Sequence, residues 1–198
     1  IRHADGTPAD RPLAVAEVQA YAAAALSMGA DLLDDAVNNS SLPRSLGAYR
    51  SRAAEIEAAF DAEFWLPDRS FYAVAKQADG TVVDGVTSNI GHCLWTGLVP
   101  DTRADAVVDM LLSEGLTGGW GLRTTSAADD GYSPVSYHTG GVWPHDTALM
   151  MLGLANYGYN TAAERVGRYI LDAAKSFQDN RLPELDCGFS RHESPTQN

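Results

Sequence analysis

Stretches that carry almost no charge alternate along this chain with stretches that are polar on one side. The segment from Leu13 to Ala30 has Glu17 as its only ionised side chain, and a helix that is apolar all round is buried on all sides. The segment from Leu46 to Trp65 instead places apolar residues at spacings of three or four, with charged residues between them. That spacing is typical of a surface helix with one core-facing stripe.

The same pair of segments recurs twice. The stretches from Gly91 to Leu98 and from Asp146 to Tyr157 are apolar, and amphipathic stretches follow them from Thr102 to Glu114 and from Asn160 to Phe177. The repeat predicts an all-α fold, for which a plain helical bundle and an (α/α) toroid are the two arrangements. An inner ring of helices wrapped by an outer ring explains the alternation better. We therefore expect residues 1–198 to supply about half of a single toroid domain.

Two segments interrupt the helical pattern. Apolar runs at Phe71 to Ala75 and at Thr81 to Val83 flank Asp79-Gly80, a pattern that predicts a β-hairpin. The segment from Gly115 to Val142 is long and rich in Gly, Ser and aromatic residues. Loops of this length inside a compact domain are usually functional or mobile.

The composition narrows the possible partners. The formal net charge of −12 argues against a nucleic acid or an anionic membrane as partner, because both attract clustered Lys and Arg. No apolar run approaches the roughly 20 residues that cross a bilayer. The chain has no initiator Met and no leader at its start, so we expect neither a signal peptide nor a natural beginning. Cys93 and Cys187 lie far apart and predict no disulfide framework, which makes the cytoplasm the default location.

Polar and aromatic residues gather where each predicted buried helix begins. They occur around Glu17, around Thr87-Ser88-Asn89, and in the two stretches Trp120 to Arg123 and Tyr137 to Asp146. In a toroid these junctions all open at one end. Aromatic faces stack on sugar C–H surfaces while charged groups bind hydroxyls, so this set predicts a carbohydrate pocket.

Structural roles compete with this interpretation at several positions. Asp146 could simply start a helix, because an acid complements the positive helix end. His92 could equally be a satisfied core histidine, and Trp65 and Trp95 are typical packing residues. Glu17 is different, because a lone carboxylate on an apolar helix is costly to bury without partners. We therefore assign Glu17 to function.

Other chemistries fit the sequence less well. His138 and His145, together with Asp146, lack a compact metal-ligand spacing, so neither a metal nor another cofactor is expected. The glycines of Gly118-Gly119-Trp120-Gly121 are not followed by Lys-Ser/Thr, and no Gly-x-Ser-x-Gly elbow occurs. Neither a phosphate-binding loop nor a serine nucleophile is predicted.

The motifs, taken in order, resemble the bacterial amylo-α-1,6-glucosidase family, which is related to the C-terminal glucosidase domain of glycogen debranching enzymes. The segments that carry the resemblance are His3–Gly6, Ala16–Tyr21, Val86–His92, Leu94–Gly97, Gly119–Thr124, Ser136–His138, Val142–Asp146, Leu182–Leu185 and Cys187–Phe189. Any one of them is weak evidence, but the ordered set spans nearly the whole chain.

The resemblance implies an (α/α)₆ toroid that hydrolyses α-glucosidic bonds, above all α-1,6 linkages of glycogen-like glucans and oligosaccharides, with inversion. Inverting enzymes use a general acid and a general base with room for water between them. By similarity, Glu184 would be the general base. The residue that serves the family as general acid would lie before Ile1, outside this chain. The residues that would line the sugar subsite are Glu17, Gln19, Trp120, Arg123, Tyr137, His138, Trp143, His145 and Asp146.

Two further interpretations stay open. Because the family pattern continues past Phe189 into another helix, this fragment alone is predicted to be inactive and could be a non-catalytic carbohydrate-binding or assembly fragment. The same toroid also serves other sugars, so the substrate could be another α-glycoside such as trehalose or a mannosyl glycoside. A half toroid leaves apolar helix faces uncovered. We therefore expect either the missing half of the toroid or a second copy as a partner.

Overall fold

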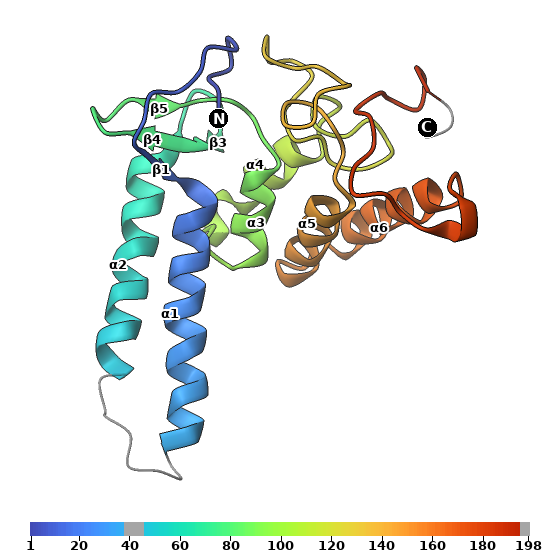
Figure 1. Ribbon diagram of the computed structural model, residues 1–198. Helices are drawn as coiled ribbons and strands as arrows, with labels where there is room; N and C mark the ends of the chain where they lie inside the picture. The colour runs from blue at the N-terminus through green and yellow to red at the C-terminus, as the bar shows by residue number, and fades with distance from the viewer. Residues whose placement is uncertain (38–45, 195–198) are drawn as a thin grey trace.

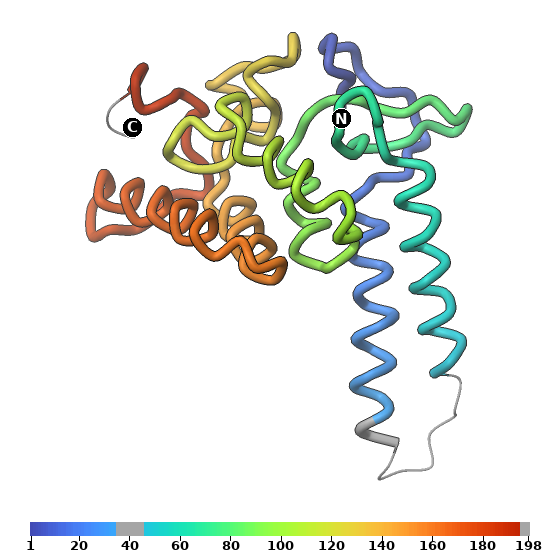
Figure 2. The backbone as a smooth tube through the Cα atoms, turned by 180° about the vertical axis from the view of Figure 1, so that it is seen from behind, coloured from blue at the N-terminus to red at the C-terminus, as the bar shows by residue number. Residues whose placement is uncertain are grey.

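The computed structural model describes residues 1–37 and 46–194 and is dominated by three successive helical hairpins (Figure 1). Their helices are α1 (Ala16–Val37) with α2 (Leu46–Phe64), α3 (Asn89–Trp95) with α4 (Asp101–Leu111), and α5 (Pro144–Asn156) with α6 (Asn160–Ala174); a short 3₁₀ turn, η1 (Gln178–Asn180), follows. Helices α1, α3 and α5 pack on one another in that order, α2 packs on α1, and α6 packs on α5. Figure 2 shows the molecule from behind, and in that view α4 lies in front of α3.

The first helix begins later than its sequence pattern predicts. Leu13–Val15 forms strand β1 and pairs antiparallel with β4 (Ala75–Gln77). Helix α1 starts at Ala16, whose backbone N–H donates to the Val74 carbonyl. The prediction of a helix from Leu13 was wrong because the strand's partner lies about sixty residues away, where helical periodicity gives no signal. The other five predicted helices are present, with ends shifted by a few residues.

The predicted hairpin exists, but its first strand is displaced. Strand β4 pairs with β5 (Val82–Val83) around Asp79-Gly80, and Gly80 has a φ of 90°, which glycine adopts without strain. The apolar run at Phe71 was expected to belong to this hairpin. Instead β3 (Phe71–Tyr72) pairs with β2 (Trp65–Leu66), directly after α2. Phe71, Tyr72 and Ala75 are all fully buried, so the apolar run continues from β3 into β4. Composition alone could therefore not separate these two strands.

Helix α3 lies at the centre of the core. All its residues from Ile90 to Leu94 are buried, as predicted for an inner helix. The largest side chains that are fully buried around it are Phe60, Phe71, Tyr72, Leu111, Leu116, Leu122, Met150 and Leu154. Their burial on both sides of α3 joins the three hairpins into one core.

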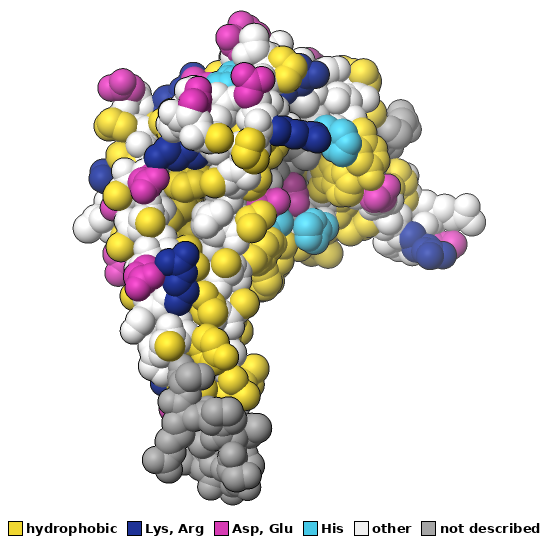
Figure 3. Space-filling view, turned by 60° about the vertical axis from the view of Figure 1, so that its left-hand side comes forward, with side chains coloured by type: hydrophobic (Ala, Val, Ile, Leu, Met, Phe, Trp, Pro, Cys, Tyr) yellow, Lys and Arg dark blue, Asp and Glu magenta, His cyan; other side chains and the backbone are white. Residues whose placement is uncertain are grey.

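Helix α1 was predicted to be buried on all sides, and this prediction was wrong. Its alanines are buried, but a stripe of exposed residues at helical spacing follows its other side, made of Val18, Tyr21, Ala25, Met28 and Leu32. Met28 is 64% exposed and Leu32 72%. We call these five residues the α1 stripe. Tyr21 contacts His92 and Trp95 of α3, but the stripe is otherwise exposed because α2 packs on another side of α1. Figure 3 shows hydrophobic side chains along one side of this hairpin, next to a hollow with histidine and acidic side chains.

The long segment 115–142 contains neither helix nor strand among its described residues and is held by isolated bridges. Thr125 pairs with Thr87, Arg123 pairs with Val142, and Val142 pairs with Asp186. These bridges bring the segment to the starts of α3 and α5 and beside the chain that follows α6. Within the described ranges, none of the helices has the length and apolar character that crossing a bilayer requires.

Candidate active site

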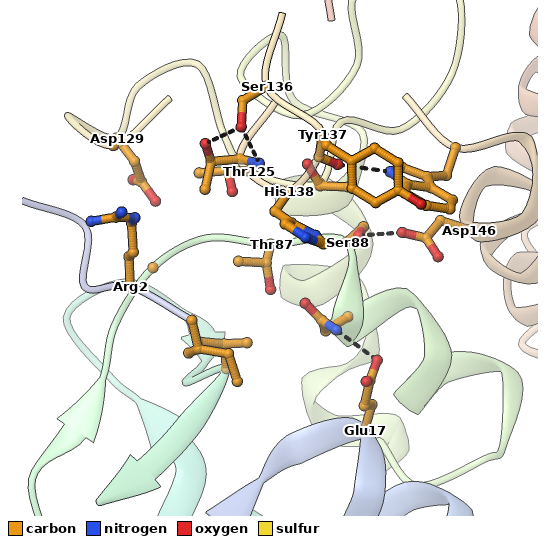
Figure 4. Close-up of a pocket in the computed structure, with 18 of the residues that line it drawn as sticks. Arg2, Glu17, Thr87, Ser88, Thr125, Asp129, Ser136, Tyr137, His138 and Asp146 are labelled. Atoms are coloured by element: carbon orange, nitrogen blue, oxygen red, sulfur yellow. Dashed lines mark hydrogen bonds between the residues drawn. The ribbon is translucent and has the colours of Figure 1, made fainter. Parts of the chain in front are cut away.

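A pocket of about 830 Å³ lies where α1, α3 and α5 begin (Figure 4). Its walls come from the three helix starts, from the N-terminal segment and from segment 115–142. The lining side chains that carry charge, hydrogen-bonding groups or aromatic rings are Arg2, His3, Glu17, Tyr21, Thr87, Ser88, Asn89, His92, Thr124, Thr125, Asp129, Ser136, Tyr137, His138, Thr139, Trp143, His145 and Asp146. The predicted convergence of the inner helix starts is therefore present in the fold.

Asp146, in the first turn of α5, is the most heavily hydrogen-bonded carboxylate of the pocket. Ser88 Oγ donates to its Oδ2 at 2.6 Å, His92 Nε2 lies 3.1 Å from its Oδ1, and His145 Nδ1 lies 3.2 Å from the same oxygen. Burial alone would raise the pKa of Asp146, but the hydrogen bonds from His92 and Ser88 outweigh it and hold that pKa below its usual range. Asp146 is therefore an ionised acceptor inside the pocket.

Glu17 forms a second acidic point at the start of α1. Asn89 Nδ2, in the first turn of α3, donates to its Oε2 at 2.6 Å. The carboxylate that looked too costly to bury thus has an amide partner from a neighbouring helix and still lines the pocket. Figure 4 shows Glu17 below Asp146, across the pocket floor.

Aromatic rings form the wall beside Asp146. The Tyr137 ring packs edge-on against Trp143 with centroids 4.9 Å apart and against His138 at 4.7 Å. The Tyr137 hydroxyl donates to Glu184 Oε1 at 3.0 Å, and this bond raises the pKa of Tyr137. Glu184 itself is exposed and stands just outside the lining, so Tyr137 connects it to the pocket.

The opposite end of the pocket is formed by Arg2, Thr87, Thr125 and Asp129 (Figure 4). Asp129 accepts the Val86 backbone N–H at 2.8 Å, and burial raises its pKa. The Thr87 hydroxyl oxygen is buried without a hydrogen-bond partner among the described residues. This end therefore combines the Arg2 guanidinium, the Asp129 carboxyl and a buried hydroxyl without a partner.

A glycine admits the N-terminal segment to this end. A Cβ on Gly85 would lie 2.7 Å from the Arg2 carbonyl oxygen, well inside van der Waals contact. Only glycine lets the two backbones approach so closely. Gly85 thereby fixes the position of Arg2 beside the pocket.

The structure brings together six of the sequence-predicted site residues, which are Glu17, Tyr137, His138, Trp143, His145 and Asp146. It does not bring in Gln19, whose side chain turns back to the Val15 carbonyl at 3.3 Å.

Trp120 and Arg123 also lie outside the pocket, contrary to the expectation that they line it. The Arg123 guanidinium is buried and donates to the carbonyls of Gly188, Glu114 and Gly115. Trp120 is buried beneath Arg191, whose guanidinium carbon lies 4.2 Å from the centroid of the Trp120 ring. Both side chains hold the segment after α6 against the rest of the fold.

Several pocket residues were absent from the predicted set. Ser88 and His92 bond Asp146, and Asn89 bonds Glu17; their position at the start of an apolar helix was a signal that could have found them. Thr87 belongs to the same polar run before α3, whereas Asp129 gave no such signal, because it looks like an ordinary turn residue in sequence. Among the residues that the structure describes, no three His, Cys, Asp or Glu side chains gather in a metal-binding group.

Residues 5–185 match the family model of the mannosylglycerate hydrolase MGH1-like glycoside hydrolase domain. A mannosylglycerate hydrolase from Rubrobacter radiotolerans is 32% identical over 139 residues, which are 66% of this chain and 31% of that protein. Among solved structures, neutral trehalase from Saccharomyces cerevisiae matches with a TM-score of 0.75 at 18% identity, over 89% of this chain and 34% of that one. A mannosylglycerate hydrolase from Thermus thermophilus in complex with glucose matches with a TM-score of 0.74 at 17% identity, over 94% and 44%.

These comparisons correct the motif resemblance at its finer level. They support a glycoside hydrolase of the helical toroid type and give no specific support to an amylo-α-1,6-glucosidase. The chain spans only about a third of the curated relative and less than half of each of these two solved structures. The match over residues 5–185 places the chain in the MGH1-like glycoside hydrolase domain family.

Proposed function

We propose that this chain supplies the sugar-binding part of a glycoside hydrolase that cleaves a hexosyl glycoside with a small acidic aglycone, of which mannosylglycerate is the type. The observation that carries the proposal is the distribution of charge in the pocket. Glu17 and Asp146 lie at one end with the aromatic wall, while the other end holds the Arg2 guanidinium together with Asp129, whose carboxyl has a pKa raised by burial. Carboxylates bind sugar hydroxyls, and a guanidinium pairs with a carboxylate through two hydrogen bonds.

The relatives support the same substrate class. Two of the similar proteins are mannosylglycerate hydrolases, and a further structure of the Thermus thermophilus enzyme contains D-glycerate. A neutral α-1,6-linked glucan or trehalose would bring no carboxylate to Arg2, so we treat both as competing substrates. The cytoplasmic location stays a prediction from the sequence.

In the proposed mechanism, Glu184 is the general base of an inverting hydrolysis. It is exposed at the edge of the pocket, where it accepts a hydrogen bond from Tyr137, and an inverting base needs a water molecule between itself and the sugar. Asp146 and Glu17 would bind hydroxyls of the sugar that loses its aglycone. The general acid would come from outside this chain, so the isolated chain would bind substrate without hydrolysing it.

The substitution Glu184→Gln in the complete parent enzyme tests the base. We expect kcat on mannosylglycerate to fall by about 10²–10⁴-fold, the usual contribution of a general base, while binding changes little because the amide keeps the Tyr137 contact. The exposed Glu164 on α6 offers a matched control, Glu164→Gln, that leaves kcat unchanged. Turnover that survives Glu184→Gln would remove Glu184 from this role.

The substrate assignment is tested separately by comparing kcat/KM for mannosylglycerate, isomaltose and trehalose with the unaltered parent enzyme. We expect mannosylglycerate to be preferred, because it alone offers a carboxylate to Arg2. Preference for isomaltose would restore the α-1,6-glucosidase interpretation. Titration of the 198-residue chain with mannosylglycerate would show binding without product if the chain alone is a binding part.

A further inference from the structure

Three side chains from three successive inner helices form a row of hydrogen bonds across the pocket floor. Tyr21 of α1 places its hydroxyl 2.5 Å from His92 Nδ1, and His92 of α3 places Nε2 3.1 Å from Asp146 Oδ1 on α5. The Tyr21 and His92 rings meet edge-on with centroids 5.8 Å apart. His92 is buried, with 5% of its side chain exposed. The row therefore crosses the whole series of inner helices.

The chemistry of Asp146 assigns the protons in this row. An ionised carboxylate only accepts hydrogen bonds, so His92 Nε2 must carry the proton that it shares with Asp146. Burial, together with the nearby carboxylates of Glu17 and Asp146, raises the pKa of Tyr21, so its hydroxyl keeps its proton. That proton is available to His92 Nδ1. A neutral ring with Nδ1 bare and Nε2 protonated satisfies every donor and acceptor in the row.

This arrangement fixes Asp146 through both of its oxygens. Ser88 holds Oδ2 and His92 holds Oδ1, and both donors belong to the buried start of α3. The third neighbour, His145, has 65% of its side chain exposed and gives weaker restraint. The lone pairs of Asp146 that Ser88 and His92 leave unused are those available to a ligand in the pocket.

We infer that His92 is a positioning residue, which Tyr21 holds in one tautomer so that its Nε2 proton orients the Asp146 carboxylate toward a sugar hydroxyl. The inference rests on the proposed function in taking a sugar as the occupant of the pocket. The other titratable groups around the row are Glu17, Cys93 and His145.

A structural role for His92 as mere core filling makes a different prediction from a positioning role. A glutamine amide reaches the place of the histidine Nε2, whereas an asparagine amide reaches only the place of Nδ1. A positioning role therefore distinguishes His92→Gln, which keeps a donor on Asp146, from His92→Asn, which loses it. Core filling would favour neither amide on hydrogen-bonding grounds.

The tautomer is measured directly by nitrogen NMR of the histidine-labelled 198-residue chain at neutral pH. We expect His92 to show a protonated Nε2 and a bare Nδ1. Tyr21→Phe should change the protonation or tautomer of this ring, because it removes the donor on Nδ1, whereas Tyr49→Phe on the exposed side of α2 should not. A ring protonated on Nδ1 in the unaltered chain would overturn the inference.

Binding of mannosylglycerate to the same chain supplies the second measurement. We expect His92→Asn to weaken binding about 10-fold or more, equal to the loss of one hydrogen bond to a charged group, and His92→Gln to stay within about 3-fold. His192→Gln, outside the pocket lining, is the matched control. Equal losses in both His92 variants would overturn the inference. If the unaltered chain binds no mannosylglycerate, the proposed function fails, and the ring-nitrogen spectrum alone decides the role of His92.

Discussion

At the scale of single residues, the partners of a buried carboxylate decide its charge. Asp146 and Asp186 are both largely buried, but Asp146 receives hydrogen bonds from Ser88 and His92. Among the described residues, no group donates to the Asp186 side chain, and burial raises its pKa to about 6. Asp146 is therefore held ionised, while Asp186 keeps its proton until the pH rises to about 6.

Asp186→Asn should change the pH dependence of stability. The Asp186 carboxyl loses its proton at about pH 6 in the folded chain and near pH 4 when unfolded. The folded state therefore binds more protons between these values, and its stability falls as the pH rises from about 4 to 6. The variant lacks this loss. Between pH 4 and pH 7, its free energy of unfolding in urea should therefore rise by on the order of 2 kcal/mol relative to that of the unaltered chain. The exposed Asp68→Asn is the control, and a pH-independent difference would contradict the assignment.

The sequence could predict where the site lies but only part of its membership. Charged and aromatic residues at the starts of apolar helices stand out, and this located Glu17 and Asp146 correctly in one pocket. It could not separate them from Arg123, because a guanidinium that bonds backbone carbonyls has the same sequence signal as one that faces a ligand. Thr87 stood in the polar run before α3, but the burial of its hydroxyl depends on tertiary packing and could not be predicted.

At the scale of elements, local periodicity and distant pairing differ in how far the sequence reveals them. The helices were predictable because their apolar spacing is local. Strand β1 was not, because its three residues gain strand geometry only from β4, and the segment 115–142 was predictable only as a loop. What orders that loop is a set of contacts to segments distant in sequence.

Arg123 is the main contact of this kind, and Arg123→Lys should loosen the loop. A lysine ammonium cannot reproduce the fork that serves Gly188, Glu114 and Gly115 together. Leaving buried carbonyls unpaired should cost on the order of 2 kcal/mol of unfolding free energy. Chemical denaturation would measure this, with the exposed Arg52→Lys on α2 as control. If stability is unchanged but sugar binding is lost, Arg123 belongs to the ligand after all.

At the scale of the whole molecule, the described chain has an uncovered apolar side. The α1 stripe is exposed in a chain that spans about a third of its curated relative. Apolar surface of this kind is normally covered by a partner. The expected partner, another part of the domain or a second copy, stays a prediction.

Replacing Met28 and Leu32 together by Gln should reduce self-association of the isolated chain. Each side chain is more than half exposed in the α1 stripe, so the change removes apolar surface at little cost in folding. Light scattering across a concentration series should show a lower mean mass than for the unaltered chain, and Tyr49→Gln on α2 should not lower it. If the unaltered chain is already a stable monomer, the expectation of self-association is wrong.

The buried hydroxyl of Thr87 gives the pocket wall a cost that no charge supplies. A polar atom that is closed to solvent without a partner costs about 1–3 kcal/mol, and Thr87 Oγ1 is in that position among the described residues. Because no solvent reaches this oxygen, an occupant of the pocket lowers that cost only if the side chain rotates and brings the hydroxyl to it. Filling the pocket would then be coupled to a rotation of one threonine.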